Sequence, residues 1–310
     1  MLINATLVII GIIAVLWGAD RLTDGAVSLA QRIGISEMII GLTVVALGTS
    51  APELCISLVS AFKGSTGLAV GNVVGSNIFN TLLIVGIAAM VTPITISRPT
   101  VKKDIPFAIL ASIMLIFIGL DGQISRLDAA ILLLVFIGFM FYTLKTSKRD
   151  EKKTEGASPK YGIPASVFFF LLGLACLLLG SQIFVNSAVE IARALNISEA
   201  VIGLTIVAGG TSLPELATSV VAARKGQSAI AIGNVLGSNV FNILFILGTT
   251  GAIHPLRMNG ITEIDLTVMT ISIVLLWLFS YTKFKVERWE GVVMTGIFLG
   301  YITWIVTETI

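Results

Sequence analysis

Two glutamates, Glu53 and Glu215, stand in strongly apolar sequence, and each directly follows a proline. They end a phrase that the chain carries twice, Gly-Thr-Ser-Ala-Pro-Glu and Gly-Thr-Ser-Leu-Pro-Glu. An ionised carboxylate near the centre of a bilayer costs several kcal/mol unless it is paired, hydrated or coordinated. No Lys or Arg stands close to either glutamate in the sequence. Two such carboxylates at matching positions therefore predict a functional site for a cation.

The side chains around the two glutamates offer oxygen. They are hydroxyls and amides, and proline and glycine are expected to free backbone carbonyls near Ala46 and Ala208. Ser76 and Asn80 share a helix face at i and i+4, whereas Asn77 and its counterpart Asn239 do not lie squarely on it, which makes the latter two interface residues. The ligands expected from helix position are Ser76 and Asn80 in the first copy and Ser238 and Asn242 in the second. Thr49, Ser50, Thr211 and Ser212 offer further oxygens nearby.

An all-oxygen set suits a hard cation, and the absence of a Cys or His cluster argues against zinc, copper and iron. Ca²⁺ takes six to eight oxygens in flexible geometry, whereas Mg²⁺ holds its water and is seldom caged by protein alone. Na⁺ is close to Ca²⁺ in size, so the same groups can serve both ions. The two carboxylates neutralise one Ca²⁺. Three Na⁺ bound in place of that Ca²⁺ would leave one net positive charge to cross the membrane.

The two phrases belong to a longer duplication. Residues 36–86 align without a gap on residues 198–248, and more than half of the positions are identical. Each copy also contains the phrase Gly-Ser-Asn-x-Phe-Asn, at 75–80 and 237–242.

The composition indicates a helical membrane protein. The 310 residues are 55% hydrophobic and 12% charged, about half the charged share of soluble domains, and the mean hydropathy is +0.98. Long apolar runs recur along the chain. Proline should break the second and seventh spans in mid-membrane. We expect an all-α membrane protein with ten spans, at 3–32, 36–62, 66–92, 103–120, 127–145, 162–193, 198–223, 228–252, 264–282 and 289–307.

The placement of Lys and Arg predicts the orientation. If the basic linker 146–161 is cytoplasmic, all but four of the 20 Lys and Arg residues lie on that side, and both termini are outside. Five spans per half is an odd number, so the second half enters the membrane from the opposite side. The expected units are therefore a first five-helix repeat (1–145), the linker, and an inverted repeat (162–310). The four exceptions are Lys63, Arg126, Arg193 and Arg257.

Other polar residues have simpler interpretations. Cys55 and Cys176 are expected to be unpaired packing residues inside helices. Asp20, Arg21 and Asp24 lie toward the cytoplasmic end of the first helix, and their counterparts in the sixth are not charged, which predicts ion pairs at the interface. His254 is expected in a solvated loop, and no nucleophile–base set or cofactor motif indicates an enzyme. Spread-out basic residues give no sign of nucleic-acid binding, and no obligatory protein partner is evident.

On these motifs the chain resembles the Ca²⁺/cation antiporter superfamily, and within it the prokaryotic Na⁺/Ca²⁺ exchangers. The resemblance covers nearly the whole chain. It implies four cation sites between the second, third, seventh and eighth helices, and sliding of the first and sixth helices across the other eight. Some relatives carry Asp where this chain has Asn242, so this pocket has one acid fewer. Carried over, Glu53 and Glu215 ligate Ca²⁺ with the carbonyls of Thr49 and Thr211, and Na⁺ sites add Ala46, Ser50, Ser76, Asn80, Ala208, Ser212, Ser238 and Asn242.

The leading hypothesis is an electrogenic Na⁺/Ca²⁺ antiporter of the cell membrane, with Na⁺ and Ca²⁺ as transported substrates and no cofactor. One alternative is H⁺/Ca²⁺ exchange, or Na⁺/Ca²⁺ exchange that also needs K⁺. A passive cation channel is a further alternative, because carboxylates also line pores.

Overall fold

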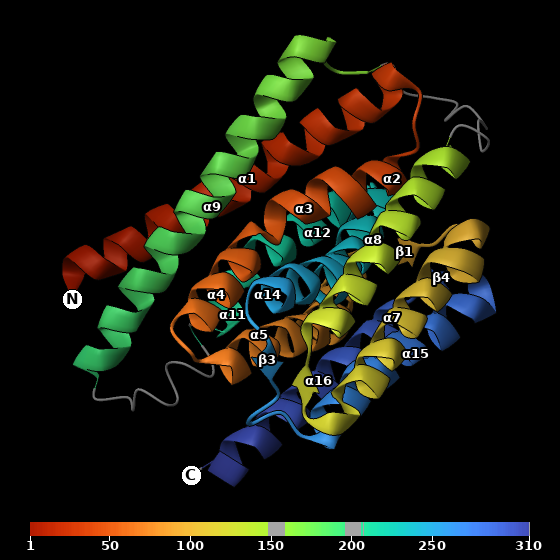
Figure 1. The fold of residues 1–310 in the computed structure, drawn as a ribbon. Coiled ribbons are helices and arrows are strands. Elements are labelled where there is room, and N and C mark those ends of the chain that lie inside the picture. The colour runs from red at the N-terminus through yellow and green to blue at the C-terminus, as the bar shows by residue number, and fades with distance from the viewer. Residues whose placement is uncertain (148–158, 196–205, 207, 310) are drawn as a thin grey trace.

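The protein is all-helical apart from four two-residue strands, in a computed structural model that describes residues 1–147, 159–195, 206 and 208–309 (Figure 1). Eight of the described helices are long and apolar enough to cross a membrane, and a bent pair, 37–49 with 51–62, gives one further candidate. The protein is therefore a multi-pass helical membrane protein.

The helices follow one another closely along each half of the chain. The first half contains α1 (Leu2–Ile33), α2 (Glu37–Ile40), η1 (Gly41–Val45), α3 (Ala46–Thr49), α4 (Ala51–Phe62), α5 (Thr66–Ile78), η2 (Phe79–Ile84), α6 (Val85–Val91), β1 (Ile94–Thr95), η3 (Thr100–Asp104), α7 (Ile105–Ile118), η4 (Gly119–Asp121), β2 (Gln123–Ile124) and α8 (Arg126–Ser147). The second half contains α9 (Ile163–Ala194), α11 (Ala208–Thr211), α12 (Leu213–Arg224), α13 (Ser228–Val240), η6 (Phe241–Ile246), α14 (Leu247–Ile253), β3 (Leu256–Arg257), α15 (Glu263–Lys283), β4 (Lys285–Val286) and α16 (Arg288–Thr309).

Nine of the ten expected spans coincide with these helices, with ends that agree within a few residues. The expected span 198–223 begins outside the described residues, and its described part comprises α11 and α12. The helices η1, η2, η3 and η6 have π geometry, and each directly adjoins an α-helix. Such π segments occur often at functional sites.

Two helical segments form the centre of the molecule. In the most apolar 18-residue stretch of Ser228–Ile253, 94% of the residues are buried, and in that of Thr66–Val91, 72%. In the other six unbent candidate spans the share is at most 33%. Glycine allows the close packing here: a Cβ on Gly233 would lie 2.7 Å from the carbonyl oxygen of Met38, so α13 runs directly against α2 and η1. The polar side chains of these central segments are thereby removed from lipid.

The long helices α1 and α9 form a pair on one side of the other helices (Figure 1). Each has 32 residues, about 48 Å at 1.5 Å per residue, which exceeds the bilayer core of about 30 Å and requires tilt. A Cβ on Gly18 would lie 2.7 Å from the carbonyl oxygen of Gly173, so the two backbones touch. Small residues at the crossing therefore hold this pair together.

Two short antiparallel strand pairs join the two halves of the chain. Strand β1 pairs with β4, with Ile94 opposite Val286, and β2 pairs with β3, with Ile124 opposite Leu256. The offset of 162 residues found in the duplicated segment also relates Ile94 to Leu256 and Ile124 to Val286. The β1–β4 pair is therefore equivalent to the β3–β2 pair, with the two halves of the chain exchanged. The equivalence between the halves extends well beyond residues 36–86.

Candidate ion-binding site

Each candidate glutamate lies in the first turn of a helix that follows a break. The helix α3 ends at Thr49, Ser50 has φ −82° and ψ 7°, and α4 begins with Pro52 in its first turn. The axes change direction by 44° at this point. In the second half Ser212 has φ −89° and ψ 9° between α11 and α12. Because proline cannot donate a backbone hydrogen bond, it starts the second segment of each pair and interrupts the bonding across the break.

The breaks bring the two glutamates together in the interior. Glu53 and Glu215 are each only 1% exposed and lie close enough for their charges to interact. None of the ion pairs between described residues includes either carboxylate. Two buried carboxylates without a basic partner either bind protons or stay ionised beside another source of positive charge.

Each carboxylate receives a hydrogen bond from the other half of the chain. The hydroxyl of Ser50 donates to Oε1 of Glu215 at 3.1 Å, and the hydroxyl of Ser212 donates to Oε1 of Glu53 at 3.2 Å. The same two serines also reach Ser238 (2.9 Å) and Ser76 (3.4 Å), respectively. These six side chains form one continuous cluster.

Four asparagines extend the cluster along the contact between the central segments. Nδ2 of Asn242 donates to Oδ1 of Asn77 at 3.0 Å, and Nδ2 of Asn80 donates to Oδ1 of Asn239 at 3.2 Å. Asn77 and Asn239 therefore lie at the interface, as expected from their helix positions. Asn239 also donates to Thr81 at 2.8 Å. These bonds fix the amide orientation of Asn80 and Asn242.

Four buried oxygens of this cluster have no hydrogen-bond donor among the described residues. They are Oε2 of Glu53, Oε2 of Glu215, Oδ1 of Asn80 and Oδ1 of Asn242. A buried acceptor without a donor is rare in folded proteins because its desolvation is not compensated. Coordinated cations would satisfy such oxygens, and the set consists of the hard oxygen ligands that Ca²⁺ and Na⁺ prefer.

The carbonyl of Ala46 differs from the expectation. It accepts a hydrogen bond from the backbone N–H of Ser50 at 2.9 Å and from the hydroxyl of Thr49 at 3.3 Å, so it is not left free by the break. The reason is that Pro52 has no backbone N–H, so the helical hydrogen bond that is missing is the one to the carbonyl of Gly48, four residues earlier, and not the one to Ala46. Ala208 and Thr211 are the first and last residues of α11. Ligation by Ala46, Ala208 and the carbonyls of Thr49 and Thr211 stays a prediction.

Sequence reasoning missed two asparagines that support the glutamates. Nδ2 of Asn72 donates to the carbonyl of Glu53 at 3.2 Å and to the hydroxyl of Ser57 at 3.1 Å. Asn234 makes the equivalent bonds to the carbonyl of Glu215 at 3.4 Å and to Ser219 at 3.0 Å. Both copies of the duplicated segment have asparagine at this position, which could have indicated a role. Their hydrogen-bond partners lie on a neighbouring helix, however, and the spacing of residues along the sequence does not show which residues of two helices meet.

Asn234 also connects the two halves. Its Oδ1 accepts a hydrogen bond from the hydroxyl of Thr49 at 3.1 Å, while its Nδ2 contacts Glu215 and Ser219. One buried side chain thus touches expected ligand residues of both copies.

Three further expectations concern residues outside the cluster. Cys55 and Cys176 are free thiols, as expected, but Cys55 is exposed rather than packed in the interior. His254 is exposed, and its Nδ1 lies 3.0 Å from the carbonyl oxygen of Pro255. Asp20 and Asp24 form ion pairs, described below.

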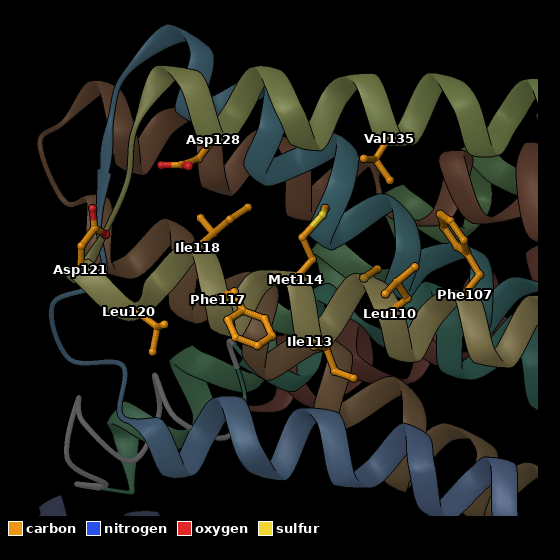
Figure 2. A pocket seen from close by; sticks show the side chains of 11 residues that line it. Phe107, Leu110, Ile113, Met114, Phe117, Ile118, Leu120, Asp121, Asp128 and Val135 are labelled. Carbon is orange, nitrogen blue, oxygen red and sulfur yellow. The ribbon is translucent and has the colours of Figure 1, made fainter.

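A cavity of about 630 Å³ lies elsewhere, between α7 and α8, and Figure 2 shows its lining. The walls are almost wholly apolar, with Asp121 and Asp128 at one end. The carboxylate of Asp128 is engaged at the start of α8, where it accepts bonds from the backbone N–H (2.9 Å) and hydroxyl (2.6 Å) of Ser125. This cavity has neither the converging oxygens nor the burial of the glutamate cluster, and it is separate from the candidate ion site.

Known proteins match the chain along nearly its whole length. The family model for sodium/calcium exchanger protein matches residues 3–145 and 165–307. The chain is 38% identical to the putative antiporter CaxA of Alkalimonas amylolytica, over 97% of this chain and 98% of that protein. It is 32% identical to the sodium/calcium exchanger MaX1 of Methanosarcina acetivorans, over 97% of both chains.

A solved structure of the sodium–calcium exchanger NCX_Mj superposes on the fold with a TM-score of 0.87. The sequences are 32% identical, and the match covers 98% of this chain and 99% of that one. The family match spans both halves, and the relatives are exchangers and antiporters. The chain belongs to the sodium/calcium exchanger family.

Proposed function

We propose that this protein is a secondary antiporter that exchanges Na⁺ for Ca²⁺ across the cell membrane by alternating access. The observation that carries the proposal is the set of four buried oxygens without donors on Glu53, Glu215, Asn80 and Asn242. They belong to a cluster whose two carboxylates carry a formal charge of −2 when ionised, and one Ca²⁺ neutralises this charge. Exchange for about three Na⁺ would move one net charge per cycle.

The ligand set follows from the same cluster. Glu53 and Glu215 bind Ca²⁺, and the serine and asparagine oxygens complete the Na⁺ sites. Because both ions use the same carboxylates, their occupancies exclude each other, and this competition couples the two fluxes. The further ligands are Thr49, Ser50, Ser76, Asn80, Ala46, Thr211, Ser212, Ser238, Asn242 and Ala208.

The proposed architecture has ten spans in two inverted repeats, 1–145 and 162–310, with breaks in the second and seventh spans. The exchanged contacts between the halves support a twofold relation, and the odd number of spans per half makes the repeats antiparallel. The linker 146–161 is cytoplasmic and both termini are outside, as the distribution of Lys and Arg favours. Accessibility of single cysteines in the linker and at each terminus, measured in intact cells, tests this orientation.

The decisive experiment is ion exchange in proteoliposomes. Glu53→Gln and Glu215→Gln each remove one of the two charges, so Na⁺-driven Ca²⁺ uptake should be lost in both variants. Glu263→Gln, an exposed change at the start of α15, serves as the control. Full residual exchange in either glutamate variant would contradict the assignment.

The coupling ion and ratio need separate measurements. The reversal potential of the Na⁺-driven Ca²⁺ current gives the ratio. Robust Ca²⁺ flux driven by a pH gradient without Na⁺ or K⁺ would instead indicate proton exchange, and a strict K⁺ requirement would indicate K⁺-dependent exchange. Single-channel steps in a planar bilayer would indicate a channel.

A further inference from the structure

A cluster of charged side chains ties α1 to the end of α12. Nζ of Lys225, directly after α12, lies 2.6 Å from Oδ1 of Asp20 and 2.7 Å from Oδ1 of Asp24. Lys225 also donates to the backbone carbonyl of Asp20 at 3.0 Å. Lys160, just before α9, lies 2.6 Å from Asp24, and this bond raises the pKa of Lys160. Arg21 completes the cluster, 3.5 Å from Asp20.

The helix held by this cluster carries part of the ion site. Glu215 is in the first turn of α12, and Lys225 follows its last turn. The helix α1 packs along α12, whereas α9 has no comparable packing against α4 in the described part of the chain. The α1–α9 pair therefore covers α12 but leaves its counterpart α4 uncovered.

Burial of equivalent residues records this difference. Ala217 on α12 is 6% exposed, whereas its equivalent Cys55 on α4 is exposed. Val59 on α4 is 50% exposed, whereas its equivalent Val221 is half-buried. In the opposite closure α9 would cover α4 as α1 covers α12 here, and Ala217 would become accessible.

The duplication shows which residues would meet in that opposite closure. The equivalent of Lys225 is Lys63, and the equivalents of Asp20 and Asp24 are Gln182 and Asn186. Lysine is thus present at both ends, but at these two positions only α1 has carboxylates. The one acidic residue of α9, Glu190, lies a turn further on and pairs with Arg193 at 3.0 Å. Amides offer Lys63 neutral hydrogen bonds in place of two ion pairs.

We propose that Asp20, Asp24 and Lys225 are positioning residues that favour the conformation in which α1 is closed on α12 over its opposite. The two access states of this chain are then unequal in free energy without bound ions. The proposal rests on the alternating-access function proposed above, with the α1–α9 pair as the moving unit. Partly exposed ion pairs contribute modestly, so removing both should change the ratio of the two states by about three- to tenfold.

The test measures a residue that only the minor state exposes. In a background with Cys55→Ala and Cys176→Ala, Ala217→Cys is labelled with a water-soluble maleimide on the purified full-length protein, without Na⁺ or Ca²⁺. Asp20→Asn with Asp24→Asn should raise the labelling rate about three- to tenfold. Lys225→Gln should do the same, which provides a second variant if the first does not fold. Lys225→Arg keeps a positive charge beside both carboxylates and should keep labelling slow.

A second arm separates a change of state from local loosening. Gln182→Glu with Asn186→Asp gives Lys63 two carboxylates without touching the contact between α1 and α12. It should also raise the labelling rate of Ala217→Cys. Lys283→Gln breaks an exposed pair with Glu287 (3.0 Å) away from this contact and serves as the control.

Labelling that stays at the control rate in the Asp20, Asp24 and Lys225 variants overturns the proposal. A rise in these variants alone, without one in Gln182→Glu with Asn186→Asp, also overturns it, because it shows a local effect. Labelling does not require ion flux. Failure of Na⁺-driven Ca²⁺ uptake in the wild-type protein would therefore overturn the proposed function, and the labelling rates would still report the ratio of the two conformations.

Discussion

Ser50 donates a hydrogen bond to Glu215 across the contact between the two halves, with 3.1 Å between the oxygens. The bond has an equivalent from Ser212 to Glu53 at 3.2 Å. Each carboxylate is therefore held by a hydroxyl 165 or 159 residues away in the chain, on the other half.

The first prediction concerns these two serines. Ser50→Ala and Ser212→Ala each remove a bond to a charged acceptor, which is worth about 1.5–3 kcal/mol, so the half-saturating Ca²⁺ concentration should rise about tenfold or more in each. Na⁺-driven Ca²⁺ uptake in proteoliposomes measures it. Ser112→Ala is the control, because Ser112 is equally buried but bonds only to the carbonyl of Ile109 on its own helix. Unchanged affinity in both site variants would show that the bonds do not shape the site.

The second prediction concerns the asparagines behind the glutamates. Asn234→Ala should weaken Ca²⁺ binding severalfold, because it removes bonds to Thr49, Glu215 and Ser219 at once. Calcium binding to purified protein checks this, alongside a thermal melt to show that the variant is folded. Asn259→Ala, an exposed change, should leave both properties unaltered. A variant that loses thermal stability but binds Ca²⁺ normally would assign Asn234 to folding alone.

Much of this site could be predicted because the duplication marks it twice. A carboxylate that follows a proline within an apolar helix is unusual, and its repetition at Glu53 and Glu215 indicated the candidate site and the bend between Thr49 and Ala51. Helix ends were predictable because apolar runs are bounded by charged and glycine-rich turns, as at Gly34, which ends α1 with φ 70°.

The rest depends on distances between helices. The bond from Asn72 to Ser57 joins neighbouring helices, and the one from Asn77 to the backbone of Asn239 joins the two halves; periodicity fixes the face of a residue but not its partner. The carbonyl of Ala46 is not left free as expected, because the hydroxyl of Thr49 and the backbone N–H of Ser50 both donate to it. Local hydrogen bonds of this kind occupy oxygens that could otherwise bind an ion, and they cannot be predicted from the spacing of residues in the sequence.

The third prediction concerns the crossing of α1 and α9. Gly18→Leu should prevent the pair from packing, because even a Cβ would lie 2.7 Å from the carbonyl of Gly173 and 2.8 Å from the backbone nitrogen of Leu177. The yield of monodisperse protein on size exclusion and its melting temperature should fall sharply. Gly296→Leu is the matched control, since no atom lies within 4 Å of its Cβ position. Equal behaviour of the two variants would contradict close packing at Gly18.

The fourth prediction concerns pH and a surface cluster between α15 and α16. Hydrogen bonds from Lys285 and Lys283 lower the pKa of Glu287 to about 2. Its unfolded value is about 4.3, so its contribution to stability is present above that pH and is lost as pH falls toward 2. The difference in melting temperature between wild type and Glu287→Gln should therefore stay constant from neutral pH to about pH 5 and vanish near pH 2. A difference that already shrinks between pH 7 and pH 5 would contradict the lowered pKa.

The exchanged strand pairs and serine–carboxylate bonds have a consequence for the origin of the molecule. Ile94 pairs with Val286, and Ile124 pairs with Leu256 in the equivalent way. Ser50 donates to Glu215, and Ser212 donates to Glu53 in the equivalent way. Neither half holds a complete set of partners for its own carboxylate. Two identical half-length chains, arranged as a symmetric dimer, would supply every one of these bonds to each other. The fusion of such an ancestor would then have freed the two copies to diverge, as the carboxylates of α1 and the amides of α9 have done.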